Sequence, residues 1–87
     1  MNEKTEMLTS AVEHRRREVM HYQINIDNYR AAIAEIDTNY KGDADLIPFR
    51  EQLCELLRTS LIEQTKERIM LTVIERQLTE LGGDNVG

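Results

Sequence analysis

The chain contains few of the residues that interrupt helices or cross-link small domains. Its 87 residues include one cysteine, one proline, four glycines and no tryptophan. The single cysteine, Cys54, excludes an internal disulfide and argues against a zinc cluster, which needs several Cys or His ligands at close spacing. A lone thiol is typical of a reducing compartment, so we expect a cytoplasmic protein.

Long apolar segments and an excess of positive charge are also missing. No stretch approaches the roughly 18 consecutive apolar residues of a membrane span. The opening MNEKTEMLTS carries charges where a secretory signal has an apolar run, so we expect no such signal. Eleven basic residues against sixteen acidic ones give a formal net charge of -5, which disfavours general attraction to nucleic-acid phosphates.

The few helix-breaking residues lie only at the centre and at the end of the chain. Gly42 is placed to end a first helix in a left-handed conformation. Asp43 or Asp45 can cap a second helix, and Pro48 fits only in its first turn. The remaining glycines belong to the polar sequence GGDNVG, residues 82–87, which we expect to be a disordered tail.

A seven-residue apolar repeat runs through both halves of the chain. In the first half it consists of Val12, Val19, Ile26, Ile33 and Tyr40, with the companion series Leu8, Arg15, Tyr22, Tyr29 and Ile36. In the second half the stripe is Leu46, Phe49, Leu53, Leu57, Ser60, Gln64, Glu67, Leu71, Ile74, Leu78 and Leu81. Two stripes of this kind predict two helices that pack lengthwise.

The sequence therefore predicts an all-α, coiled-coil-like antiparallel helical hairpin as one domain, residues 1–81. We expect helices over about 5–39 and 45–81 and a turn over 41–46, with Gly82 ending the second helix. The first helix would be roughly 50 Å long at 1.5 Å per residue. A helix of that length cannot enclose a core alone and must lie along a partner.

Arg15 is the one charged residue in the first stripe. Antiparallel pairing places it within a turn of Glu67 and brings Tyr22 near Gln64. We interpret Arg15, Gln64 and Glu67 as a polar layer in the middle of the hairpin, with Arg15 paired to Glu67. Such a layer costs stability and fixes the register of the two helices.

A second set of apolar residues is left over after the hairpin forms. A stripe of this size would remain in water, and exposed patches of that extent usually mark an interface. We expect either a homodimer that closes into a four-helix bundle, which is favoured, or docking onto another protein. The predicted partner interface is Cys54, Leu61, Ile62, Ile69 and Val73 on the second helix, with Met20 and Ile24 on the first.

The sequence EHRRREVMHYQ raises two alternative interpretations. Arg16, Arg17 and His14 can form a small basic patch, and a dimer would carry it twice, as in a nucleic-acid-binding regulator that uses Arg15–Arg17. His14 and His21 share a face with Glu18, but the repeat places both histidines on the outer surface, where we expect no metal site.

No catalytic pattern is present either: the sequence lacks a glycine-rich phosphate loop and a nucleophile elbow. We expect no enzymatic activity, no cofactor and no small-molecule substrate. The favoured interpretation is a non-enzymatic interaction module, or a small regulatory or accessory protein, that binds a partner protein through the exposed apolar residues.

Two helices with heptad repeats joined across KGDADLIP resemble the Rop-type helical-hairpin regulators, which dimerise into four-helix bundles. The resemblance covers architecture alone. Rop-type hairpins are shorter, no residue motif matches, and no RNA-binding residue is carried over. The size, the acidity and the opening MNEKTEMLTSAVEHRRRE are similar to small accessory proteins from the early regions of temperate phages, which commonly bind a host or phage protein.

Overall fold

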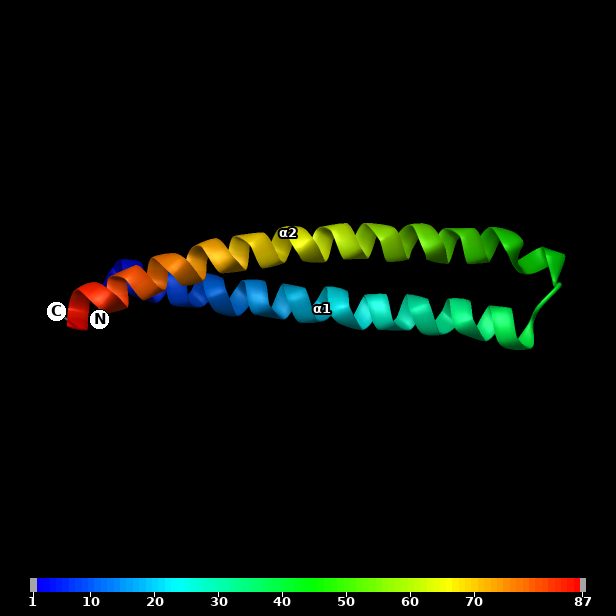
Figure 1. The fold of residues 1–87 in the computed structure, drawn as a ribbon, viewed down its shortest axis with the longest axis horizontal. Helices are drawn as coiled ribbons and strands as arrows, with labels where there is room; N and C mark the ends of the chain where they lie inside the picture. The colour runs from blue at the N-terminus through cyan, green and yellow to red at the C-terminus, as the bar shows by residue number, and fades with distance from the viewer. Residues whose placement is uncertain (1, 87) are drawn as a thin grey trace.

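A computed structural model shows two long helices folded back on one another. The structure describes the backbone of residues 2–86 and the side chains of residues 2–82. Helix α1 spans Glu3–Asn39, the short 3-10 helix η1 spans Ala44–Leu46, and α2 spans Ile47–Val86. The two helices lie side by side in a rod of 65 × 17 × 16 Å, with their outer ends together opposite the turn (Figure 1). The predicted all-α hairpin is confirmed.

Helix α1 begins two residues earlier than the sequence indicated. The side chain of Asn2 caps it by accepting a hydrogen bond from the backbone N–H of Thr5 at 2.7 Å. The carboxylates of Glu3 and Glu6 lie in the first turn, where the helix dipole favours negative charge. A capping residue and two acidic residues therefore offset the unpaired N–H groups at this end.

The chain reverses direction in a tight turn after α1. The N–H of Tyr40 donates to the carbonyl of Ile36 at 3.0 Å, and the N–H of Asp43 donates to the carbonyl of Tyr40 at 3.1 Å. Gly42 lies third in this four-residue turn with φ of +87°, while Lys41 before it has an ordinary negative φ. That combination is a type II turn, which needs glycine at the third position. The predicted positive φ of Gly42 is confirmed, but α1 ends at Asn39 with Tyr40 as its C-cap, so Gly42 lies in the turn two residues after the cap and does not itself end the helix.

Asp43 rather than Asp45 caps the second helical segment. Its side chain accepts from the N–H of Asp45 at 3.0 Å and precedes η1, after which α2 starts at Ile47 with Pro48 in its first turn. The predicted end of α2 at Leu81 is wrong, because the helix continues to Val86.

Gly82 lies inside α2 and lacks the left-handed φ of a glycine that ends a helix. A glycine within a helix costs about 1 kcal/mol relative to alanine but does not by itself end the helix. The predicted tail, residues 82–87, is therefore helical as far as Val86, and Gly87 lies outside the described residues.

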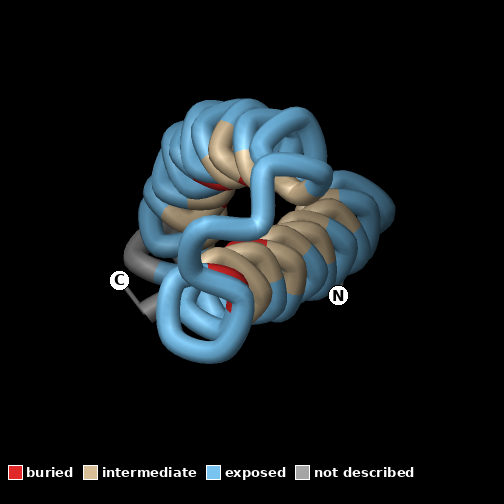
Figure 2. Tube along the Cα trace, turned by 90° about the vertical axis from the view of Figure 1, so that its right-hand side faces the viewer, coloured by how far each residue is buried: buried red, intermediate tan, exposed pale blue. Residues whose placement is uncertain are grey.

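The core is a single line of contacts between the facing sides of the two helices. Figure 2 shows buried and intermediate positions on these sides and exposed positions around the outside. The buried side chains are Val12, Ile26 and Ile36 of α1 and Leu53, Ser60, Gln64 and Ile74 of α2. All seven belong to the predicted stripes, so the heptad pattern correctly identified the contact line.

Two members of the predicted stripes are exposed instead. Tyr40 follows the last residue of α1 with φ of -128° and ψ of 23°, so its side chain leaves the helical path and is exposed. Phe49 stands four residues before buried Leu53 and so on the same side of α2, but it lies in the first turn of the helix and is 48% exposed. The next residue, Arg50, is half-buried and binds Asp37 of α1 at 2.7 Å.

Candidate interaction surface

A polar layer crosses the contact line near the middle of the rod. Nη1 of Arg15 donates to both carboxylate oxygens of Glu67, at 3.1 and 2.9 Å. The two side chains are 32% and 18% exposed, so water screens the pair only in part. The predicted pairing is confirmed. Its register-fixing role stays a prediction.

Gln64 extends this layer by one turn and makes contacts that the sequence analysis did not identify. Its Nε2 donates to the backbone carbonyl of Val19 at 3.1 Å and to Oε1 of Gln23 at 2.9 Å. No buried side-chain N or O atom among the described residues lacks a hydrogen-bond partner. Gln23 was missed because it lies beside the heptad stripe. Antiparallel numbering places Gln23 within reach of Gln64, and this proximity could have predicted the hydrogen bond between them.

The arginine run is partly neutralised by α2. Arg15 is paired with Glu67, and Nη2 of Arg16 donates to Oε2 of Glu75 at 2.9 Å. Of the predicted basic patch, Arg17 and His14 are exposed and make no ion pair within the described residues. The structure therefore leaves one arginine of the three without a carboxylate partner.

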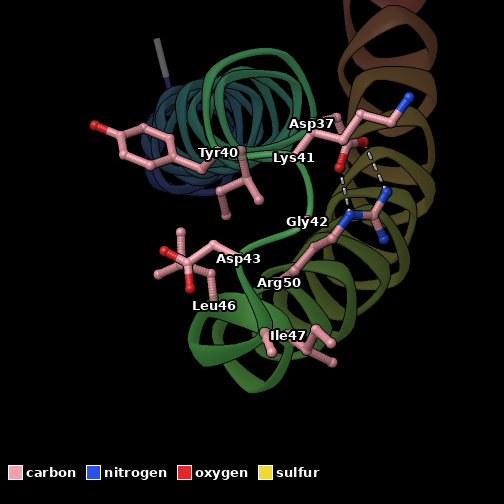
Figure 3. Close-up of a pocket in the computed structure, with 10 residues that line it drawn as sticks. Asp37, Tyr40, Lys41, Gly42, Asp43, Leu46, Ile47 and Arg50 are labelled. Carbon is pink, nitrogen blue, oxygen red and sulfur yellow. Dashed lines mark hydrogen bonds and ion pairs between the residues drawn. The ribbon is translucent and has the colours of Figure 1, made fainter.

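The tip of the hairpin holds a third ion pair between the two helices. Nε and Nη2 of Arg50 donate to the two carboxylate oxygens of Asp37 at 2.7 and 2.9 Å, as Figure 3 shows, while the ring of Tyr40 points away from this pair. These hydrogen bonds hold the pKa of Asp37 below its usual range and raise the pKa of Arg50. The pair borders an open pocket of about 400 Å³ that includes Leu46 and Ile47.

Among the described side chains, exposed large hydrophobic residues outnumber fully buried hydrophobic ones. Among the described side chains, five hydrophobic residues are buried and twelve large ones are exposed. The exposed residues are Met7, Met20, Ile24, Tyr40, Ile47, Phe49, Leu56, Leu61, Ile62, Ile69, Met70 and Val73. A hairpin with this imbalance presents apolar area on more than one side.

The predicted partner interface does not form one continuous patch. Successive residues of a helix turn by about 100°, so a residue two positions from a buried one points to roughly the opposite side. Ile24 stands two residues before buried Ile26, and Ile62 stands two residues from both buried Ser60 and buried Gln64. Ile24 therefore faces away from α2, and Ile62 faces away from α1. The predicted interface residues of α1 and those of α2 therefore lie on opposite edges of the rod, and their binding to a partner stays a prediction.

The outward edge of α2 carries four residues at seven-residue spacing: Glu55, Ile62, Ile69 and Arg76. We call this set the outer line of α2. Ile62 and Ile69 are 51% and 57% exposed, and the two charged residues are also exposed. The line therefore presents two large apolar side chains between an acidic end and a basic end.

The other predicted interface residues surround this line or lie across the rod from it. Val73 and Leu61 are exposed and flank the outer line of α2 on opposite sides. Cys54 is half-buried and lies 3.8 Å from Nη1 of Arg50. Met20 is exposed one turn before Ile24 on α1.

The histidines lie where the heptad pattern placed them. His14 and His21 are both exposed, and Nδ1 of His21 lies 4.0 Å from Oε2 of Glu18. Across the described residues, no group of three or more His, Cys, Asp or Glu side chains is arranged to hold a metal ion.

In the part of the chain that the structure describes, neither helix combines the length and apolarity that crossing a membrane would require. No protein-family model matches the sequence, and comparison with curated proteins and with solved structures finds no match.

Proposed function

We propose that this chain is a non-enzymatic protein-interaction module, acting in the cytoplasm as a regulatory or accessory protein. The observation that carries the proposal is the excess of exposed over buried large hydrophobic side chains, twelve against five among the described residues. Exposed apolar surface of this extent usually marks a binding surface. The half-buried Cys54 makes no disulfide, which suits a reducing compartment.

The outer line of α2 supplies the principal contact. Ile62 and Ile69 point away from α1, and nothing within the described chain covers them. Their burial against a partner would remove both side chains from water, which favours association by roughly 25 cal/mol for each Å² of apolar surface. Val73 and Leu61 widen the contact on either side, and Met20 with Ile24 forms a smaller apolar surface on the opposite edge.

The basic-patch alternative has less support than this proposal. Two of its three arginines are already bound to carboxylates of α2. Nucleic-acid binding by the remaining Arg17 and His14 would have to overcome a formal net charge of -5.

The test compares Ile69→Asp with Ile24→Asp, which places the same charge on the opposite edge of the rod. We expect the wild-type chain to form an oligomer, or to retain a protein from a lysate of its host cell. Ile69→Asp removes that association and Ile24→Asp largely preserves it. Circular dichroism should show helix in all three proteins. The proposal fails when the wild-type chain is monomeric and retains the same proteins as Ile69→Asp.

A further inference from the structure

We infer that the outer line of α2 binds the same line of a second copy of this chain, in the antiparallel direction. The inference rests on the proposed function and adds the partner, the orientation and the register. Reversal of Glu55–Ile62–Ile69–Arg76 places Ile62 against Ile69 of the second copy. It also places Glu55 against Arg76 of that copy. In this arrangement apolar residues face apolar residues and each acidic end faces a basic end. The line is therefore complementary to itself, as a two-fold interface requires.

The charges on the outer line support this register. Arg76 makes no ion pair within the described residues, and Glu55 makes only the exposed pair with Arg58, at 2.7 Å. Each end of the two-fold contact gains an opposite-charge pair. Lys66 lies near Lys66 of the second copy at one side of the contact. The ion pair of each Lys66 with Glu63, at 3.0 Å, offsets the repulsion between the two like charges.

The distribution of charge along the rod favours the antiparallel direction. Residues 27–55, at the tip, include seven acidic and three basic residues, whereas residues 3–19 and 64–82, at the open end, include seven of each. A parallel dimer would place two acidic tips side by side. An antiparallel dimer places each acidic tip beside the neutral end of the other copy, where repulsion is smaller.

The chain exposes more surface than a compact protein of the same mass. The lone chain exposes 6505 Å². A compact monomer of 10.2 kDa would expose about 5,300 Å² by the usual scaling of surface with mass. The excess of about 1,200 Å² comes from the elongated shape of the rod, and burial of roughly 800 Å² per chain in an interface of standard size would remove most of it.

Disulfide trapping tests the register. In a Cys54→Ser background, Thr65→Cys lies beside the two-fold centre, within about 2 Å of its copy along the helix axis at 1.5 Å per residue. Thr72→Cys lies on the same flank but about 20 Å from its copy. Mild oxidation should therefore link Thr65→Cys into a covalent dimer and leave Thr72→Cys unlinked. Linking of both variants would indicate a parallel dimer and overturn the inference, as would linking of neither.

Charge reversal tests the complementarity. Glu55→Arg and Arg76→Glu should each raise the dimer dissociation constant about tenfold, since each dimer contains two such pairs and an exposed pair contributes modestly. The double variant should restore wild-type association. Arg17→Glu, on the opposite edge of the rod, is the matched control and should leave the constant unchanged.

The failures of the two proposals are distinguishable. In one outcome, the double variant Glu55→Arg, Arg76→Glu fails to restore association while association still depends on Ile69. That result overturns the two-fold register but leaves the proposed interaction module standing. The same holds when the wild-type chain is monomeric but retains a different protein through Ile69. Loss of all dependence on Ile69 overturns both.

Discussion

Two isoleucines two positions apart should differ strongly in their contribution to stability. Ile26 is 1% exposed in the contact line, whereas Ile24 is 52% exposed on the opposite side of the same helix. Ile26→Ala removes three buried carbon atoms, which cost about 0.8 kcal/mol each. The cavity left behind raises the expected loss in the free energy of unfolding to about 3–4 kcal/mol.

The same truncation at Ile24 should cost about 0.5 kcal/mol, because half of its side chain is already in water and alanine favours the helix. Urea unfolding followed by circular dichroism measures both values. All samples need one protein concentration, since association makes the apparent stability depend on it. Losses that agree within about 0.5 kcal/mol would refute the heptad contact line, which rests on this difference in burial.

Three further variants test the turn, the tip and the polar layer. Gly42→Ala should lower the free energy of unfolding, measured in urea, by about 1–2 kcal/mol, because a φ of +87° is strained for alanine although the surrounding space is open. Gly82→Ala should raise the same free energy by up to about 1 kcal/mol, because alanine favours the helix more than glycine does. The depressed pKa of Asp37 means that its pair with Arg50 contributes stability above the unfolded-state pKa of about 4 and loses it as pH falls. Asp37→Asn should therefore flatten the acid limb of a stability-against-pH curve, and an unchanged limb would contradict the pairing. Glu67→Ala should cost about 1 kcal/mol in urea unfolding, because the arginine bound to it keeps partial access to water, and a loss above about 3 kcal/mol would show a more buried pair.

The contact line was predictable because a seven-residue repeat identifies which side of each helix is covered. Every buried residue among the described side chains belongs to a predicted stripe, and the Arg15–Glu67 pair also followed from antiparallel numbering. The errors lie where the helices begin and end. Tyr40 satisfies the repeat but follows the last helical residue, and Phe49 satisfies it but lies in the first turn of α2, where it is exposed. A seven-residue repeat gives the direction of each side chain on an ideal helix, but it does not give the residues at which the helix begins and ends.

The residues proposed to bind a partner follow from the same repeat. The sequence has one set of leftover apolar residues on each helix, and Ile24 and Ile62 of these sets point in opposite directions. These directions were predictable, because Ile24 and Ile62 each stand two residues from a member of a predicted stripe. The structure adds the exposed fractions of Ile62 and Ile69 and the ion pairs of the neighbouring charged residues, which the repeat does not give.

The polar layer bears on which residues of α2 face outward. We expect buried Gln64 and the Arg15–Glu67 pair to favour one register between α1 and α2, at a cost in stability relative to apolar residues. One register keeps Ile62 and Ile69 on the outward edge of α2, because a rotation of α2 would bury them. The proposed interaction surface therefore depends on one fixed register of the hairpin.

The most direct test is the solution mass of the purified chain, measured by light scattering over a series of protein concentrations. Self-association through the outer line of α2 predicts a mass of about twice the 10.2 kDa chain, with Ile69→Asp reduced to the monomer. A wild-type mass of 10.2 kDa at every concentration would contradict self-association through this surface.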